Sequence, residues 1–85
     1  MQIQHLSGFK RQYKRLSREV QIAAEKKEKV FRKNPFDSRL KTHKLTGELD
    51  GYWAFSINFS YRIIFQFADG EIIYFYRIGK HDIYD

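Results

Sequence analysis

Three histidines are the residues of this chain best suited to proton transfer. His5 lies near the N-terminus, His43 lies in a basic segment halfway along the chain, and His81 lies close to the C-terminus. An imidazole donates and accepts protons near neutral pH, so His43 and His81 are candidate catalytic acids or bases. A structural or solvated role is expected for His5, and a surface position without chemistry is the alternative for the other two.

The last two apolar segments, residues 61–68 and 71–78, predict a β-hairpin. They are rich in Tyr, Phe and Ile and are separated by an Asp-Gly pair at residues 69–70, which is typical of two-residue type I′ turns. Such a turn pairs Ala68 with Glu71. In that register one face of the hairpin is wholly apolar or aromatic, and we expect this face to receive the helices.

The same register places Arg62 directly opposite Arg77. Like charges in directly opposite positions destabilise a sheet, whereas two neighbouring guanidinium groups suit the fork geometry of a shared phosphate. The register therefore predicts an anion-binding site on the face away from the helices. The alternative is that each arginine pairs with a nearby carboxylate, such as Asp82 or Glu48.

Two helices are predicted ahead of this hairpin. Ser7 resembles the N-cap of a first helix, and apolar residues follow it at spacings of four and three. Ser17 resembles the cap of a second, longer helix. That helix is expected to end at about Lys33, because the residue before Pro35 avoids the α-helical region of backbone conformation.

The remaining segments complete the predicted fold. Residues 2–6 suit a short first strand, residues 35–50 are loop-like, and residues 52–57 are rich in aromatic and apolar side chains that favour a strand. The predicted order is β-α-α-β-β-β. It indicates one α+β domain over residues 1–85, in which two N-terminal helices pack on one face of an antiparallel sheet.

The positive charge of the chain is concentrated in its first half. The net charge is +6, and residues 1–44 carry thirteen of the 16 Lys and Arg but only four of the ten Asp and Glu. Such an uneven balance favours a polyanionic partner, such as a nucleic acid, the ribosome or an acidic protein segment. The alternative is that these charges form a solvated helix face.

Several function classes are disfavoured. The chain has no cysteine, which excludes disulfides and thiolate metal sites. Neither a spacing typical of metal ligands nor a glycine-rich loop typical of nucleotide cofactors occurs. No apolar run approaches the roughly 18 residues of a membrane span, and the N-terminus lacks the apolar part of a secretory signal. We therefore expect a cytoplasmic protein without a metal, a cofactor or a membrane partner.

Four segments carry a likeness to a known group of proteins. They are residues 34–45 (NPFDSRLKTHKL), 51–53 (GYW), 61–65 (YRIIF) and 77–84 (RIGKHDIY). In their order and spacing they resemble the RelE/ParE superfamily of toxins of toxin–antitoxin systems, nearest to the branch of the YafQ and YoeB toxins. The likeness covers nearly the whole chain.

This resemblance implies a type II toxin that acts as a ribosome-dependent mRNA endonuclease. The ribose 2′-hydroxyl would attack the adjacent phosphate, without a metal or cofactor. The implied partners are a cognate antitoxin protein, the ribosome and mRNA, with operator DNA reached only through the antitoxin. Two alternatives stay open: a toxin like ParE, which inhibits DNA gyrase by binding, and an antitoxin-binding or RNA-binding domain without activity.

The resemblance also implies roles for individual residues. His43 matches the position of a general base, Arg62 that of a strand arginine that stabilises phosphate charge, and His81 that of an acid or phosphate contact. Tyr84 would contact the substrate. Further contacts with phosphate or RNA are expected from Arg77, Lys44, Lys80 and Ser56.

The chain departs from the family pattern at four positions. Trp53 and Phe55 stand where RelE-type toxins carry lysines. Ser56 stands where YoeB-like toxins carry an arginine, and Ser60 where YafQ-like toxins carry an aspartate. We therefore expect a less cationic phosphate site than in several relatives.

Overall fold

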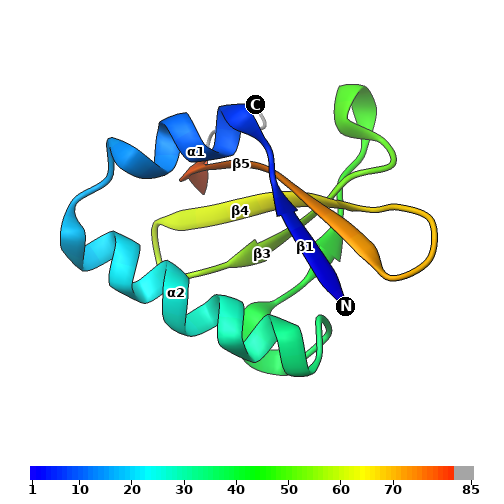
Figure 1. The fold of residues 1–85 in the computed structure, drawn as a ribbon, viewed down its shortest axis with the longest axis horizontal. Coiled ribbons are helices and arrows are strands. Elements are labelled where there is room, and N and C mark those ends of the chain that lie inside the picture. Colours follow the sequence, from blue (N-terminus) through cyan, green and yellow to red (C-terminus); the bar gives the residue numbers. More distant parts are fainter. Residues whose placement is uncertain (82–85) are drawn as a thin grey trace.

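A five-stranded sheet with two helices on one face forms the domain (Figure 1). The computed structural model describes residues 1–81. The strand order across the sheet is β1-β5-β4-β3-β2. The elements are β1 (Gln2–His5), α1 (Ser7–Lys14), α2 (Arg18–Lys33), the 3-10 helix η1 (Ser38–Leu40), β2 (His43–Lys44), the 3-10 helix η2 (Gly47–Leu49), β3 (Trp53–Ser56), β4 (Tyr61–Phe67) and β5 (Ile72–Lys80).

The predicted α+β class and the order of the main elements are confirmed, but the sheet is mixed rather than wholly antiparallel. β1 pairs in parallel with β5, and the other neighbours are antiparallel. A tight turn fixes the direction of a strand relative to the next one, and no turn joins β1 to β5. The local pattern therefore contained no signal for the direction of β1. The loop-like segment 35–50 also contributes the short edge strand β2.

The second helix begins and ends as predicted, whereas the predicted cap of the first helix is wrong. The hydroxyl of Ser17 accepts a hydrogen bond from the backbone N–H of Val20 at 3.3 Å, and α2 ends at Lys33 before the extended residue Asn34. Ser7, in contrast, is the first residue of α1 rather than its cap. The cap position is Leu6, whose side chain cannot accept a hydrogen bond.

The predicted hairpin register is also wrong, first of all at the turn. Phe67 pairs with Ile73, and the backbone N–H of Ala68 donates to the carbonyl of Ile72 at 2.9 Å. The loop thus has three residues rather than two. A type I′ turn needs positive φ at both central residues. Among the described residues other than glycine only Lys41 has positive φ, so the Asp of the Asp-Gly pair does not meet this requirement.

A β-bulge then shifts the register a second time, and this shift separates the two arginines. Phe65 pairs with Phe75, but Ile64 pairs with Arg77, so that Tyr76 is the extra residue of β5. Arg62 consequently lies opposite Gly79. The predicted anion site between Arg62 and Arg77 is therefore not formed.

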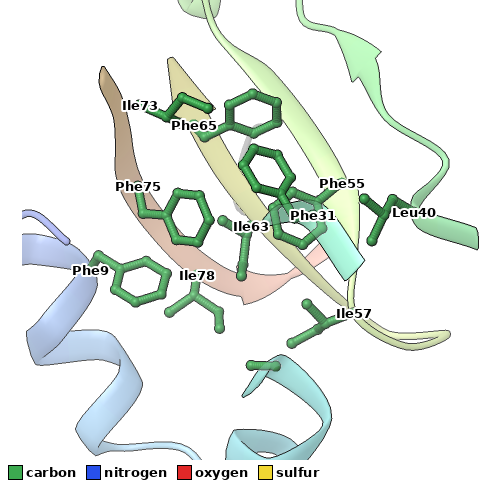
Figure 2. Close-up of a cluster of buried hydrophobic side chains, with 11 residues drawn as sticks. Phe9, Phe31, Leu40, Phe55, Ile57, Ile63, Phe65, Ile73, Phe75 and Ile78 are labelled. Atoms are coloured by element: carbon green, nitrogen blue, oxygen red, sulfur yellow. The ribbon is translucent and has the colours of Figure 1, made fainter. Parts of the chain in front are cut away.

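The main core lies between the helices and the sheet and is dominated by phenylalanine. Phe31 of α2 is fully buried, and its ring centroid lies 4.9 Å from those of Phe55 and Phe65 and 5.4 Å from that of Phe75. Figure 2 shows these rings together, with aliphatic side chains such as Ile78 filling the space around them. Aromatic packing onto α2 thus holds the helix layer to the sheet.

No helix within residues 1–81 is long and apolar enough to cross a membrane.

The core predicts a strong dependence of stability on Phe31. Phe31→Ala removes a ring that contacts three others, and we expect it to lower the free energy of unfolding by about 3–5 kcal/mol. Urea denaturation followed by circular dichroism measures this change. Ile22→Ala is the matched control because Ile22 lies on the same helix but is 40% exposed, and it should cost no more than about 1 kcal/mol. Equal losses for both variants would contradict the packing described.

Candidate functional site

The face of the sheet away from the helices carries a second, smaller apolar cluster. Ala54 and Ile64 are buried there together with Leu45. Tyr52 and Tyr76 pack against them, with their ring centroids 5.0 Å apart. This face therefore combines a small apolar base with aromatic side chains.

Arg62 and Ser56 lie on this same face, because they are directly paired and each is two residues from a member of the cluster. Both line a cavity of about 620 Å³ at the turn where β3 ends and β4 begins. His81 lines it as well. The structure thus brings together three of the residues proposed from the sequence.

The guanidinium of Arg62 fastens the turn between β3 and β4. Its Nη1 donates to the carbonyls of Asn58 at 2.9 Å, Phe59 at 3.3 Å and Tyr61 at 3.0 Å. These acceptors are neutral, and no carboxylate of residues 1–81 forms an ion pair with Arg62. The turn therefore orients the positive charge of Arg62, and no carboxylate of the described residues neutralises it.

His81 is held at the same turn through its backbone. Its N–H donates to the carbonyl of Ser60 at 2.9 Å. β5 also extends to Lys80, two residues further than predicted, and this extension carries the chain to the turn. The exposed His81 consequently lies at the cavity that Arg62 lines.

His43 lies on the same face of the sheet but outside this cavity. It pairs with Ala54 from the edge strand β2 and lines a separate, smaller cavity that Leu49 also lines. Its Nδ1 lies 3.0 Å from the carbonyl oxygen of Lys41. A carbonyl oxygen only accepts, so Nδ1 carries the proton, and Nε2 is the basic nitrogen of the neutral ring.

The other residues proposed from the sequence lie elsewhere. Arg77 lies over the ring of Tyr76, with 4.9 Å between the guanidinium carbon and the ring centroid, and shares a pocket with Arg11 and Arg15. Lys44 and Lys80 pair with Trp53 and Tyr61, whose side chains pack against the main core. Both lysines therefore belong to the helix side of the sheet. Tyr84 lies outside the described residues.

The cavity also contains residues for which the sequence alone made no site prediction. Arg39, Lys41 and Phe59 line it, as does Lys27, which the sequence indicated only as part of a basic helix. No carboxylate of the described residues lines it. The one available signal was the positive charge of residues 1–44, which marked a polyanion-binding surface without locating it.

One of the cavity cations is already neutralised. Nη2 and Nε of Arg39 donate to the two carboxylate oxygens of Asp37 at 2.9 and 3.0 Å. These bonds, together with one from the Arg39 backbone, lower the pKa of Asp37 from 3.8 to about 2. Among the described residues that line the cavity, Lys27, Lys41 and Arg62 are the Lys and Arg side chains that form no ion pair with a described carboxylate.

Comparisons with known proteins agree on one group. The family model described as "Bacterial toxin of type II toxin-antitoxin system, YafQ" matches residues 1–84. No curated protein matches at a significant level.

Similar solved structures include YafQ from E. coli strain BL21(DE3), with a TM-score of 0.77, 18% identity and coverage of 93% of this chain and 91% of that one. A YoeB/ParE toxin from Agrobacterium tumefaciens has a TM-score of 0.78 and 18% identity, and the likeness covers 95% of this chain and 99% of that one. A chain of a YoeB–YefM complex from Staphylococcus aureus has a TM-score of 0.76 and 20% identity, and the likeness covers 95% of this chain and 97% of that one. At these identities the structural likeness establishes the fold alone.

The Asp37–Arg39 pair predicts a carboxyl that titrates unusually low. Because the folded protein lowers this pKa, the pair supports the fold above about pH 4, and its contribution is lost as the pH falls through about 2. Carbon-13 NMR of the Asp37 carboxyl should give a midpoint near 2. Arg39→Gln should raise this midpoint toward 3.8. Arg32→Gln, which removes an arginine paired with Glu28 instead, should leave it unchanged.

Proposed function

Because the chain belongs to the YafQ family of bacterial toxins of type II toxin–antitoxin systems, we propose that it is a ribosome-dependent endoribonuclease that cleaves mRNA. One observation carries this proposal beyond the family. The cavity at the β3–β4 turn combines Arg62, two lysines and the imidazole of His81, with no carboxylate among its described lining residues. A cavity of this kind suits a phosphodiester that must accept negative charge during reaction.

In the proposed reaction the ribose 2′-oxygen attacks the adjacent phosphorus and the bond from phosphorus to the 5′-oxygen breaks. The products are a 2′,3′-cyclic phosphate and a free 5′-hydroxyl. Nε2 of His43 takes the proton of the 2′-hydroxyl, His81 gives a proton to the leaving 5′-oxygen, and Arg62 stabilises the charge on the crowded phosphate. Tyr84 is proposed to contact the substrate.

Geometry supports this division of roles. His43 and Arg62 lie on one face of the sheet, separated by β3 and offset by two residues. Strand spacing puts their backbones on the order of 10 Å apart, a span that two long side chains with a phosphodiester between them can fill. The Nδ1 contact of His43 with a backbone carbonyl keeps Nε2 as the basic nitrogen.

The basic helix α2 supports docking on the ribosome. Lys26, Lys27 and Lys33 are cationic positions of α2, and Arg32 is partly neutralised by Glu28 at 3.0 Å. Attraction of such residues to ribosomal RNA phosphates weakens with salt. Because mRNA and the ribosome are the proposed targets, the proposed site of action is the cytoplasm.

A cognate antitoxin is the proposed protein partner. The Staphylococcus aureus relative was solved as a YoeB–YefM complex. By analogy, the antitoxin of this chain would bind the toxin and would also provide the only contact with operator DNA.

The first prediction of this proposal concerns His81. We expect His81→Gln to lower mRNA cleavage in a translating extract by roughly 100-fold or more, because it removes the proton donor while leaving the cations in place. Primer extension on the mRNA measures the cleavage. His5→Gln is the matched control: His5 is bound to Glu28 at 3.0 Å beside α2 and should remain fully active. Full cleavage by His81→Gln would refute the assignment of the acid.

The second prediction concerns His43. His43→Gln should also lower cleavage by roughly 100-fold or more, since it removes the proposed base. The loss of cleavage should be greatest near neutral pH. It should become smaller as the pH rises, because hydroxide can then deprotonate the ribose 2′-hydroxyl in place of His43. If the unmodified protein leaves mRNA intact and instead blocks DNA supercoiling by gyrase, the nuclease proposal fails and the ParE-like alternative is correct.

A further inference from the structure

The turn between β3 and β4 presents an aromatic ring almost wholly to solvent. Phe59 is 95% exposed, far more than any other large apolar side chain of the described residues. It lies between Asn58 and Ser60 and lines the cavity of Arg62 and His81. A single exposed aromatic ring contributes nothing to the core and is common on protein surfaces. Phe59 differs from such a ring because it lines the same cavity as Arg62, His81 and two lysines.

The backbone under Phe59 is firmly held. The side-chain oxygen of Asn58 accepts hydrogen bonds from the N–H groups of Ser60 at 2.9 Å and Tyr61 at 2.8 Å. Arg62 donates to the carbonyl of Phe59 itself at 3.3 Å and to the carbonyls on either side of the turn. Because these bonds already hold the backbone at Phe59, little backbone freedom remains to be lost when the ring binds a ligand.

The surroundings of the ring define what it can bind. Lys27, Lys41 and Arg62 bring positive charge to the same cavity, where no described carboxylate offsets them. A ligand that uses both features must carry negative charge and a flat apolar surface within a few ångströms of each other. Single-stranded RNA does so in every nucleotide, through its phosphate and its base.

We infer that Phe59 is a nucleobase-stacking residue that holds the base beside the scissile phosphate of a single-stranded RNA. This inference rests on the proposed ribonuclease function and names the part of the substrate that the site grips. Stacking on Phe59 positions the neighbouring phosphate against Arg62 and His81. Because every base has a π-face, this contact adds affinity with little sequence preference.

Binding of a non-cleavable RNA tests the inference. The probe is a short single-stranded RNA that is 2′-O-methylated throughout, and its binding is followed by fluorescence anisotropy. Phe59→Ala should weaken binding by roughly 5- to 100-fold, and Phe59→Trp should retain it. Inorganic polyphosphate, which carries the charge without bases, should bind Phe59→Ala and the unmodified protein equally.

Two controls complete the experiment. The thermal midpoint of Phe59→Ala should stay unchanged, because the side chain is exposed. Phe36→Ala removes another exposed ring, which packs against Trp53 and Phe67 away from the cavity, and should leave RNA binding unaltered.

Three outcomes overturn the inference: unchanged RNA affinity in Phe59→Ala, an equal loss of affinity for polyphosphate, or a loss of antitoxin binding alone, which would make Phe59 a protein contact. Failure of the proposed ribonuclease function is distinguished by the cleavage assay, which does not depend on the binding measurement. If the unmodified protein does not cut mRNA but binds RNA through Phe59, the nuclease proposal fails and the stacking site stands. If the unmodified protein cuts mRNA and Phe59→Ala binds RNA normally, the nuclease proposal stands and the stacking inference fails.

Discussion

The β-bulge in β5 is the constraint on which both faces of the sheet depend. Phe75 and Ile78 are both buried in the main core, although they are three residues apart on one strand. Side chains of a regular strand alternate between faces, so a spacing of three would put one of them on the wrong side. The extra residue Tyr76 restores the alternation. Burial of two large apolar side chains thus stabilises a local irregularity.

The same irregularity decides which residues reach the site. Beyond the bulge, Gly79 lies on the face of Arg62 and Lys80 lies on the face of the core. His81 then follows on the Arg62 side and is bound through its backbone to Ser60. Without the extra residue the last strand would present its side chains to the opposite faces. The packing of the core therefore sets the position of the candidate acid, although His81 itself is exposed.

Arg62 combines a structural and an electrostatic role in one side chain. Its bonds to three backbone carbonyls orient the guanidinium and stabilise the β3–β4 turn, and they leave its net charge intact because carbonyls are neutral acceptors. Arg39 shows the contrasting case, in which two carboxylate oxygens of Asp37 take up the charge. Two arginines at one cavity thus differ in how strongly they can attract a phosphate, a difference set by the charge of their acceptors.

The sequence by itself determined the features that depend on neighbouring residues. Helix α2 could be bounded because Ser17 caps it and the Asn-Pro pair ends it, and the strands could be located from their aromatic and apolar residues. The likeness to the toxin family pointed to Arg62 and His81 as candidate site residues, and the excess of positive charge in residues 1–44 pointed to a polyanionic partner. The cap, the end of the helix and the composition of the strands are each contained in a short stretch of chain.

Tertiary structure alone decided the pairing of strands and the grouping of side chains. The parallel direction of β1, the three-residue loop and the bulge depend on which residues the core can bury, and this is settled between segments distant in sequence. These contacts separated Arg77 from Arg62. They also brought Lys27, Lys41 and Phe59 to the cavity. A one-residue change in register exchanges the two faces of a strand, so local pattern could name candidate site residues but could not assemble the candidate site.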